Sequence, residues 1–143
     1  AKGFEWGIST LLTLCGFKVL WIGWGKSRIA LGGADLLASD KDTWIVAECT
    51  TGVVKTEKID RLLQAVKKIQ ETLGLKETAT QKIIPIVFTC LPEVSTGTKE
   101  SANKSGVRIQ DLKDIMKIFN ALRMNKPKEE IINLLRESVP SMT

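Results

Sequence analysis

Two apolar stretches separated by four polar residues constrain the fold most, because together they predict a β-hairpin. The strands are expected over 34–38 (ADLLA) and 43–49 (TWIVAEC), and residues 39–42 (SDKD) form the polar turn between them. A further apolar stretch, residues 17–22 (FKVLWI), precedes them and predicts another strand. Strands that are apolar on both faces have to be covered on both faces, so the sequence favours a sheet between two layers of helices.

Two acidic residues lie at the outer end of this hairpin, Asp35 entering the first strand and Glu48 leaving the second. If the hairpin turns at Lys41 and Asp42, the two acids are directly opposed, with Cβ atoms about 4.5–5.5 Å apart. A four-residue loop would shift this register by two residues. Facing carboxylates repel each other, and such a pair suits an oxygen-coordinated Mg²⁺ or Mn²⁺ ion. The alternative is that both acids cap strand ends in solvent.

The remaining segments predict one α/β domain of 143 residues in the order α-β-β-β-α-β-α-α. Pro85 predicts an edge position or a bulge for its strand. The polar stretch 91–106 predicts a long loop. Outside the three strands above, the expected elements are a helix over 4–15 that stops at Gly16, a helix from Thr56 (as N-cap) to Leu73 that stops at Gly74, a strand over 82–90, a helical stripe from Ile109 to Phe119 and a helix over 129–139.

The composition excludes several kinds of catalytic site. The chain contains no His and no Tyr, which excludes His-based triads, His-containing zinc sites, His-metal nucleases and Tyr-nucleophile recombinases. Catalysis would depend on carboxylates, Lys, Ser or Thr, or a hard metal ion. The three dispersed cysteines, Cys15, Cys49 and Cys90, predict reduced core thiols and a cytoplasmic location. The formal net charge of +5 favours a polyanionic partner, and the absence of a long apolar run argues against a membrane.

The hairpin motif and the order of elements resemble the PD-(D/E)xK nuclease superfamily. Its motif places an Asp at the start of the second core strand and (D/E)-x-K at the end of the third, and Gly33-Ala34-Asp35 and Ala47-Glu48-Cys49-Thr50 are similar to these two elements. The resemblance implies a three-layer restriction-endonuclease-like core (α-β-β-β-α-β) with a mixed central sheet over residues 1–120, and extra C-terminal helices, the last over 128–139. Because the chain begins with Ala and enters an apolar stripe at once, we expect a processed chain or a domain excised from a larger protein.

The resemblance also implies a function, namely Mg²⁺- or Mn²⁺-dependent hydrolysis of DNA phosphodiester bonds in restriction, defence or repair. By the same resemblance, the metal ligands would be the carboxylates of Asp35 and Glu48, the backbone carbonyl of Cys49 and, as an auxiliary group, Glu5.

The motif departs from the family at Thr50, which stands where relatives carry a Lys that orients the attacking water. Thr cannot supply a cation. Lys58, in the first turn of the second helix, is the first candidate for the missing charge and Lys55 is the second. A lysine at the start of a helix is disfavoured by the helix dipole, which hints at another purpose. A solvated helix lysine is the alternative.

Basic residues elsewhere predict a DNA-binding surface, and RNA is not excluded as a partner. The runner-up hypothesis is a catalytically inactive relative that binds nucleic acid or a partner protein. A homodimer, or further domains of a larger protein, would also be compatible with the sequence. The predicted nucleic-acid contacts are Arg61, Lys67 and Lys68 on the second helix and Lys99, Lys104 and Arg108 around the expected long loop.

Overall fold

The chain alternates helices and strands around one sheet, and the computed structural model describes residues 2–22, 34–75 and 82–137. In chain order the elements are α1 (Lys2–Leu14), β1 (Lys18–Trp21), β2 (Leu36–Asp40), β3 (Thr43–Thr50), α3 (Thr56–Leu73), β4 (Lys82–Thr89), α4 (Thr96–Lys104), β5 (Arg108–Gln110), α5 (Leu112–Arg123) and α6 (Lys128–Arg136).

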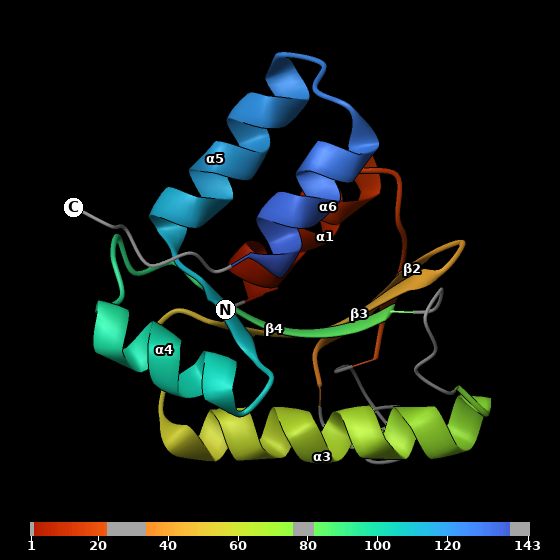
Figure 1. Ribbon diagram of the computed structural model, residues 1–143, viewed down its shortest axis with the longest axis vertical. Coiled ribbons are helices and arrows are strands. Elements are labelled where there is room, and N and C mark those ends of the chain that lie inside the picture. The colour runs from red at the N-terminus through yellow and green to blue at the C-terminus, as the bar shows by residue number, and fades with distance from the viewer. Residues whose placement is uncertain (1, 23–33, 76–81, 138–143) are drawn as a thin grey trace.

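The five described strands form a mixed sheet in the order β1-β2-β3-β4-β5. The pairs β1–β2 and β2–β3 are antiparallel, whereas β3–β4 and β4–β5 are parallel. The parallel pairs need crossover helices, and crossovers of one hand place α3 and α4 on the same face of the sheet. Helices α1, α5 and α6 cover the other face (Figure 1). The expected α/β sandwich with its α-β-β-β-α-β core and additional C-terminal helices is therefore confirmed.

The β2–β3 hairpin turns through the expected two-residue loop. Its ladder runs from Asp40 opposite Thr43 to Leu36 opposite Ala47, and Lys41 in the loop has a φ of +35°. The ladder ends at Leu36, two residues later than the predicted start of the strand. There the backbone N–H of Asp35 donates to the carbonyl of Ala47 at 2.9 Å, and Ala47 is also the residue paired with Leu36. Two consecutive residues, Asp35 and Leu36, therefore lie opposite one residue of β3. The expected regular pairing of Asp35 with Glu48 is not kept, because the chain leaves the ladder as it would at a bulge.

The alternation of side chains along the strands separates two apolar cores. Ile45, Ala47 and Phe88 pack toward α1, α5 and α6, whereas Val46 and Val87 pack toward α3 and α4. Helices α1 and α3 are each followed by the glycine predicted to stop them, Gly16 and Gly74, which adopt φ angles of +98° and +65°. The N-cap of α3 is Lys55 rather than Thr56, and its side chain caps no backbone N–H.

Several predicted elements need correction in the second half of the chain. The stretch 91–106 is not a loop, since it contains α4, whose N-cap Ser95 accepts a hydrogen bond from the backbone N–H of Thr98. The stripe that begins at Ile109 was predicted to be helical throughout, but its first residues form β5. Of the helix predicted over 129–139, residues 138 and 139 lie outside the described part.

The edge position predicted for the strand that contains Pro85 needs correction. Strand β4 lies inside the sheet, and Pro85 pairs with Val46 of β3 on one side. On the other side, β5 is only three residues long and pairs with the stretch from Ile86 to Phe88. The backbone N–H groups of Lys82 and Cys90 donate toward β3, so the backbone at residue 85 faces the opposite side, where Pro85 has no partner in β5 and its missing N–H breaks no ladder bond. Among the helices within residues 2–22, 34–75 and 82–137, none combines the length and the hydropathy of a membrane-spanning segment.

Candidate active site

The end of β3 carries the predicted motif, and its residues face opposite sides of the sheet. Glu48 and Thr50 lie on the face covered by α3, because both contact side chains of that helix. Cys49, between them, packs against the core under α1, α5 and α6. The period-2 alternation of a strand therefore gives α3 access to two motif positions and leaves the third on the opposite face.

Asp35 is tied to the same end of β3 through its side chain. Its carboxylate oxygen Oδ2 accepts a hydrogen bond of 2.7 Å from the backbone N–H of Cys49. Asp35 and Glu48 are each only 5% exposed, although carboxylates are rarely buried without a charge partner. The departure from the regular ladder at Leu36 thus aims the Asp35 carboxylate along β3 toward the motif.

Three acidic residues lie near the Cys49 thiol and affect its pKa. Burial raises its pKa most strongly, and the negative charges of Asp35, Glu5 and Glu48 raise it further. All three predicted acidic residues therefore lie within electrostatic reach of one side chain, including Glu5, which comes from α1. The raised pKa keeps the thiol protonated, so Cys49 would offer a hard metal ion its backbone carbonyl rather than sulfur.

Lys58 meets Thr50, the position at which this sequence differs from the PD-(D/E)xK pattern that it resembles. Its ammonium group donates a hydrogen bond to the hydroxyl oxygen of Thr50, and Lys58 is half-buried. Thr50 itself is 6% exposed, and its hydroxyl also accepts from the backbone N–H of Gly52 at 3.2 Å. Lys55 is exposed at the N-cap of α3. Of the two predicted lysines, the described contacts bring Lys58 to the site.

Arg61 has a neighbour that sequence reasoning missed. Its guanidinium lies 3.8 Å from the carboxylate oxygen Oε1 of Glu48, with the arginine side chain 49% exposed and the glutamate 6%. Arg61 follows Lys58 by three residues, so both project from one face of α3, and they meet Glu48 and Thr50, two residues apart on β3. The sequence shows both spacings, three residues on the helix and two on the strand. Their contact could be predicted only once α3 was known to lie over β3.

The donor set fits a magnesium ion held by few protein ligands. Asp35 and Glu48 supply two buried carboxylates at one end of the hairpin, and Mg²⁺ is commonly bound by one or two carboxylates with water and substrate phosphates completing its shell. No group of three His, Cys, Asp or Glu side chains close enough to hold a metal occurs within residues 2–22, 34–75 and 82–137. Glu5 would therefore act as an outer group and not as a third direct ligand.

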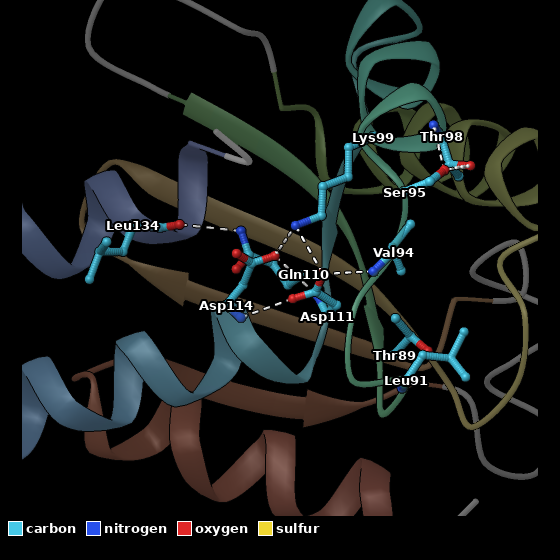
Figure 2. A network of polar contacts seen from close by, with 10 residues as sticks. All are labelled: Thr89, Leu91, Val94, Ser95, Thr98, Lys99, Gln110, Asp111, Asp114 and Leu134. Carbon is cyan, nitrogen blue, oxygen red and sulfur yellow. Dashed lines mark hydrogen bonds and ion pairs between the residues drawn. The ribbon is translucent and has the colours of Figure 1, made fainter. Parts of the chain in front are cut away.

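Lys99 is withdrawn from the predicted nucleic-acid surface, because α4 directs it into the protein. Lys99 is 6% exposed, and its ammonium lies 3.0 Å from Asp111 and 2.6 Å from Asp114 (Figure 2). The network also holds the start of α5, where Asp111 and Asp114 form a capping box and Asp111 accepts from the backbone N–H of Val94 at 2.9 Å. Lys99 serves the packing of α4 against α5.

Arg108 also turns inward. Its Nε donates to the backbone carbonyl of Arg136 at 2.5 Å and its Nη1 to the Asn103 side chain at 3.3 Å, so Arg108 ties β5 to the end of α6. Lys104 is exposed at the end of α4, and Lys67 and Lys68 are exposed on α3. These three lysines remain compatible with the predicted contacts to phosphates.

Comparison with known proteins gives a structural similarity. The fold is similar to the small subunit of the heterodimeric restriction endonuclease R.BspD6I, with a TM-score of 0.54 and 15% sequence identity. The similarity covers 96% of this chain and 81% of that subunit. No protein-family model and no curated protein matches the sequence. The α/β architecture with its mixed sheet is thus similar in fold to that restriction endonuclease subunit.

Proposed function

We propose that this chain is a nuclease domain that hydrolyses phosphodiester bonds in DNA. The observation that carries the proposal is the contact of Lys58 with Thr50, beside the buried carboxylates Asp35 and Glu48. A lysine from α3 thereby brings a cation to the position where a PD-(D/E)xK motif would place one. The similarity to a restriction endonuclease subunit supports the same reading.

The residues divide the chemistry between binding and charge stabilisation. Asp35, Glu48 and the Cys49 carbonyl would hold Mg²⁺ or Mn²⁺, which when bound lowers the pKa of a coordinated water and offsets phosphate charge. The Cys49 backbone N–H fixes the Asp35 carboxylate by donating to it. Lys58 supplies a fixed positive charge near the scissile phosphate, where negative charge grows in the transition state. Thr50 orients Lys58 by accepting its hydrogen bond.

Metal binding should stabilise the folded chain through these carboxylates. With Mg²⁺ or Mn²⁺ at about ten times its dissociation constant, linkage gives about 1.4 kcal/mol, or a rise in melting temperature of about 4 °C. Asp35→Asn should abolish most of this rise. The asparagine oxygen can still accept from the Cys49 N–H, so metal-free stability should be unchanged or higher because a buried charge is gone. Differential scanning fluorimetry across a metal titration measures both quantities.

Asp60→Asn is the matched control, since it removes one carboxylate from an exposed position on α3. It should leave the metal-induced rise intact. A parent chain whose melting temperature is the same with and without millimolar Mg²⁺ or Mn²⁺ would contradict the proposed metal site.

DNA binding should weaken with salt, since lysine–phosphate contacts release counterions. Replacing Lys67 and Lys68 together by alanine should reduce the slope of log affinity against log salt by about 0.9 for each lost phosphate contact, without changing the cleavage products. Fluorescence anisotropy of a labelled duplex at several salt concentrations measures this slope. Affinity that is independent of salt would argue against a phosphate-binding surface.

The second candidate is an inactive nuclease-fold domain that binds nucleic acid or a partner protein. The specific observation in its favour is that the two cations of α3 that reach β3 are already engaged, Lys58 by Thr50 and Arg61 by Glu48. The similar chain is itself one subunit of a heterodimeric enzyme. This candidate predicts DNA or partner binding without cleavage under any metal condition.

The expected cytoplasmic location stays a prediction.

A further inference from the structure

The outer face of α5 carries an apolar ridge that the described chain does not cover. Leu112, Met116 and Phe119 recur at helical spacing on this face and are 39%, 48% and 47% exposed. Leu14 of α1 and Met124 after α5 are each 63% exposed. Apolar residues gathered on one surface, unlike single exposed ones, mark a place where another molecule binds.

Three hollows adjoin this ridge and share its residues. A hollow of about 250 Å³ lies between α1 and α5, and it shares Phe119 with a second of about 590 Å³ bounded by α1, α5 and α6. Met116 links the first hollow to a third, of about 430 Å³, on the far side of the ridge. The three hollows thus lie next to one another along α5, whose 12 residues span about 18 Å, the length of a three-turn helix.

The hollow of about 250 Å³ between α1 and α5 has an open floor, because α1 carries Gly3 and Gly7 there. A Cβ atom added at either glycine would meet no atom within 4 Å. Packing within the described chain thus leaves room at both positions for larger residues, which would also favour the helix. The open floor leaves space for large side chains of a second molecule.

The charges around the hollows select the kind of partner. The lining of the hollow between α1 and α5 contains no charged residue, and the linings of the two hollows beside it contain five cationic residues and no carboxylate. Of these cationic residues, Lys128 is already paired with Asp40 at 2.8 Å. Asp114, the acidic residue of α5, pairs with Lys99. A second copy of this chain would bring cations against cations, whereas an acidic partner would complement them. The cationic residues are Lys113, Lys117, Arg123, Lys126 and Lys128.

We propose that the three hollows along α5, together called the α1–α5 groove, bind an amphipathic helix of a partner protein, with large apolar side chains on one face and Asp or Glu on the flanks. An apolar helix face laid into a hydrophobic groove is a recurrent mode of recognition. The concave shape favours a helix over a flat lipid surface, and exposed Met and Phe side chains offer nothing to DNA phosphates. The groove contains none of the proposed nuclease ligands, so this inference does not depend on catalysis.

A designed peptide tests the groove directly. The probe is a fluorescein-labelled 18-residue helix with Leu and Phe on one face and Glu on both flanks. A control peptide has the same sequence with Lys in place of every Glu. The full chain should bind the acidic peptide, more weakly as salt rises, and should bind the lysine peptide at least about tenfold more weakly. Fluorescence anisotropy measures both affinities.

Gly7→Leu fills the groove without disturbing the fold, since the position is open and helical. It should lower affinity for the acidic peptide by about tenfold or more, with a melting temperature equal to or above that of the parent. Thr13→Leu adds the same side chain at another exposed α1 position that lines none of the three hollows, and it should bind like the parent.

Other results would overturn the proposal in distinguishable ways. Equal affinity for the two peptides, or full binding by Gly7→Leu, would exclude the charged apolar groove as the binding surface. Binding of the parent to vesicles with 30% phosphatidylserine that Gly7→Leu loses, without peptide binding, would assign the face to a membrane. A dimer in analytical ultracentrifugation that Gly7→Leu dissociates would assign it to a second copy.

Discussion

Replacing Lys58 by alanine is expected to lower the rate of DNA cleavage by about a hundredfold or more, the scale of losing one transition-state stabiliser. The Lys58 ammonium reaches Thr50, at the end of β3 beside the two buried carboxylates. A cation that is needed as negative charge develops affects turnover more than ground-state binding. Affinity for DNA and the metal-induced rise in melting temperature should therefore stay close to the parent values. Single-turnover cleavage measured beside anisotropy separates these quantities.

Two further variants make the assignment of the cation specific. Thr50→Lys in the Lys58→Ala background places an ammonium at the motif position itself and should recover part of the lost rate. Lys55→Ala removes an exposed lysine three residues away from Lys58 and should cut like the parent. If Lys58→Ala cuts at the parental rate while Lys55→Ala does not, the catalytic charge belongs to Lys55.

The largest effect on stability is expected from Lys99→Met. Removing the ammonium leaves the buried Asp111 and the half-buried Asp114 without their shared cation, and breaking a buried ion pair in this way costs about 3 kcal/mol or more. Burial already raises the pKa of Asp114, and the negative charge of Asp111 adds to that rise. Adding Asp114→Asn to Lys99→Met should restore part of the loss. Urea denaturation followed by circular dichroism gives the free energies.

Lys104→Met is the control, because Lys104 lies on the same helix but is exposed, and its effect should stay within about 0.5 kcal/mol. Equal stabilities of Lys99→Met and Lys104→Met would show that the buried network does not hold α4 and α5 together.

The contribution of Lys99 should also disappear at alkaline pH. Burial lowers its pKa, but hydrogen bonds to Asp114 and Asp111 outweigh this, so the pKa lies above the ordinary value of 10.5. A group whose pKa is raised on folding stabilises fully below its unfolded value, and that stabilisation is lost as the pH rises through the folded value. The difference in stability between the parent and Lys99→Met should therefore be constant near neutral pH and shrink above about pH 10.5.

The hairpin could be predicted from sequence because local chemistry determines it. A polar two-residue turn between two apolar strands fixes the register, and the observed pairing of Asp40 with Thr43 follows from it. The same rule could not foresee that the ladder ends at Leu36, nor that the Asp35 side chain accepts a hydrogen bond from the Cys49 N–H, since a turn rule does not describe side-chain contacts to the backbone. The two acids were therefore correctly placed at one end of the hairpin, but not in their detailed geometry.

The second half of the chain was predicted less well because tertiary contacts decide its structure. Helix α4 (TGTKESANK) is almost entirely polar, and it buries Ala102 and Lys99. The burial of Lys99 depends on Asp111 and Asp114, 12 and 15 residues further along, so no local pattern distinguishes it from a surface lysine. Strand β5 is three residues long, too short for a period to show.

Cleavage of DNA by the parent chain and by Asp35→Asn tests the central claim most directly. Supercoiled, linear and branched DNA should each be incubated with either protein in the presence of Mg²⁺ or Mn²⁺. We expect the parent to cut at least one of the three substrates and Asp35→Asn to leave all of them intact, because the substitution removes a metal-binding charge while keeping the hydrogen bond to Cys49. A parent that leaves every substrate intact, or an Asp35→Asn variant that cuts at the parental rate, would contradict the account.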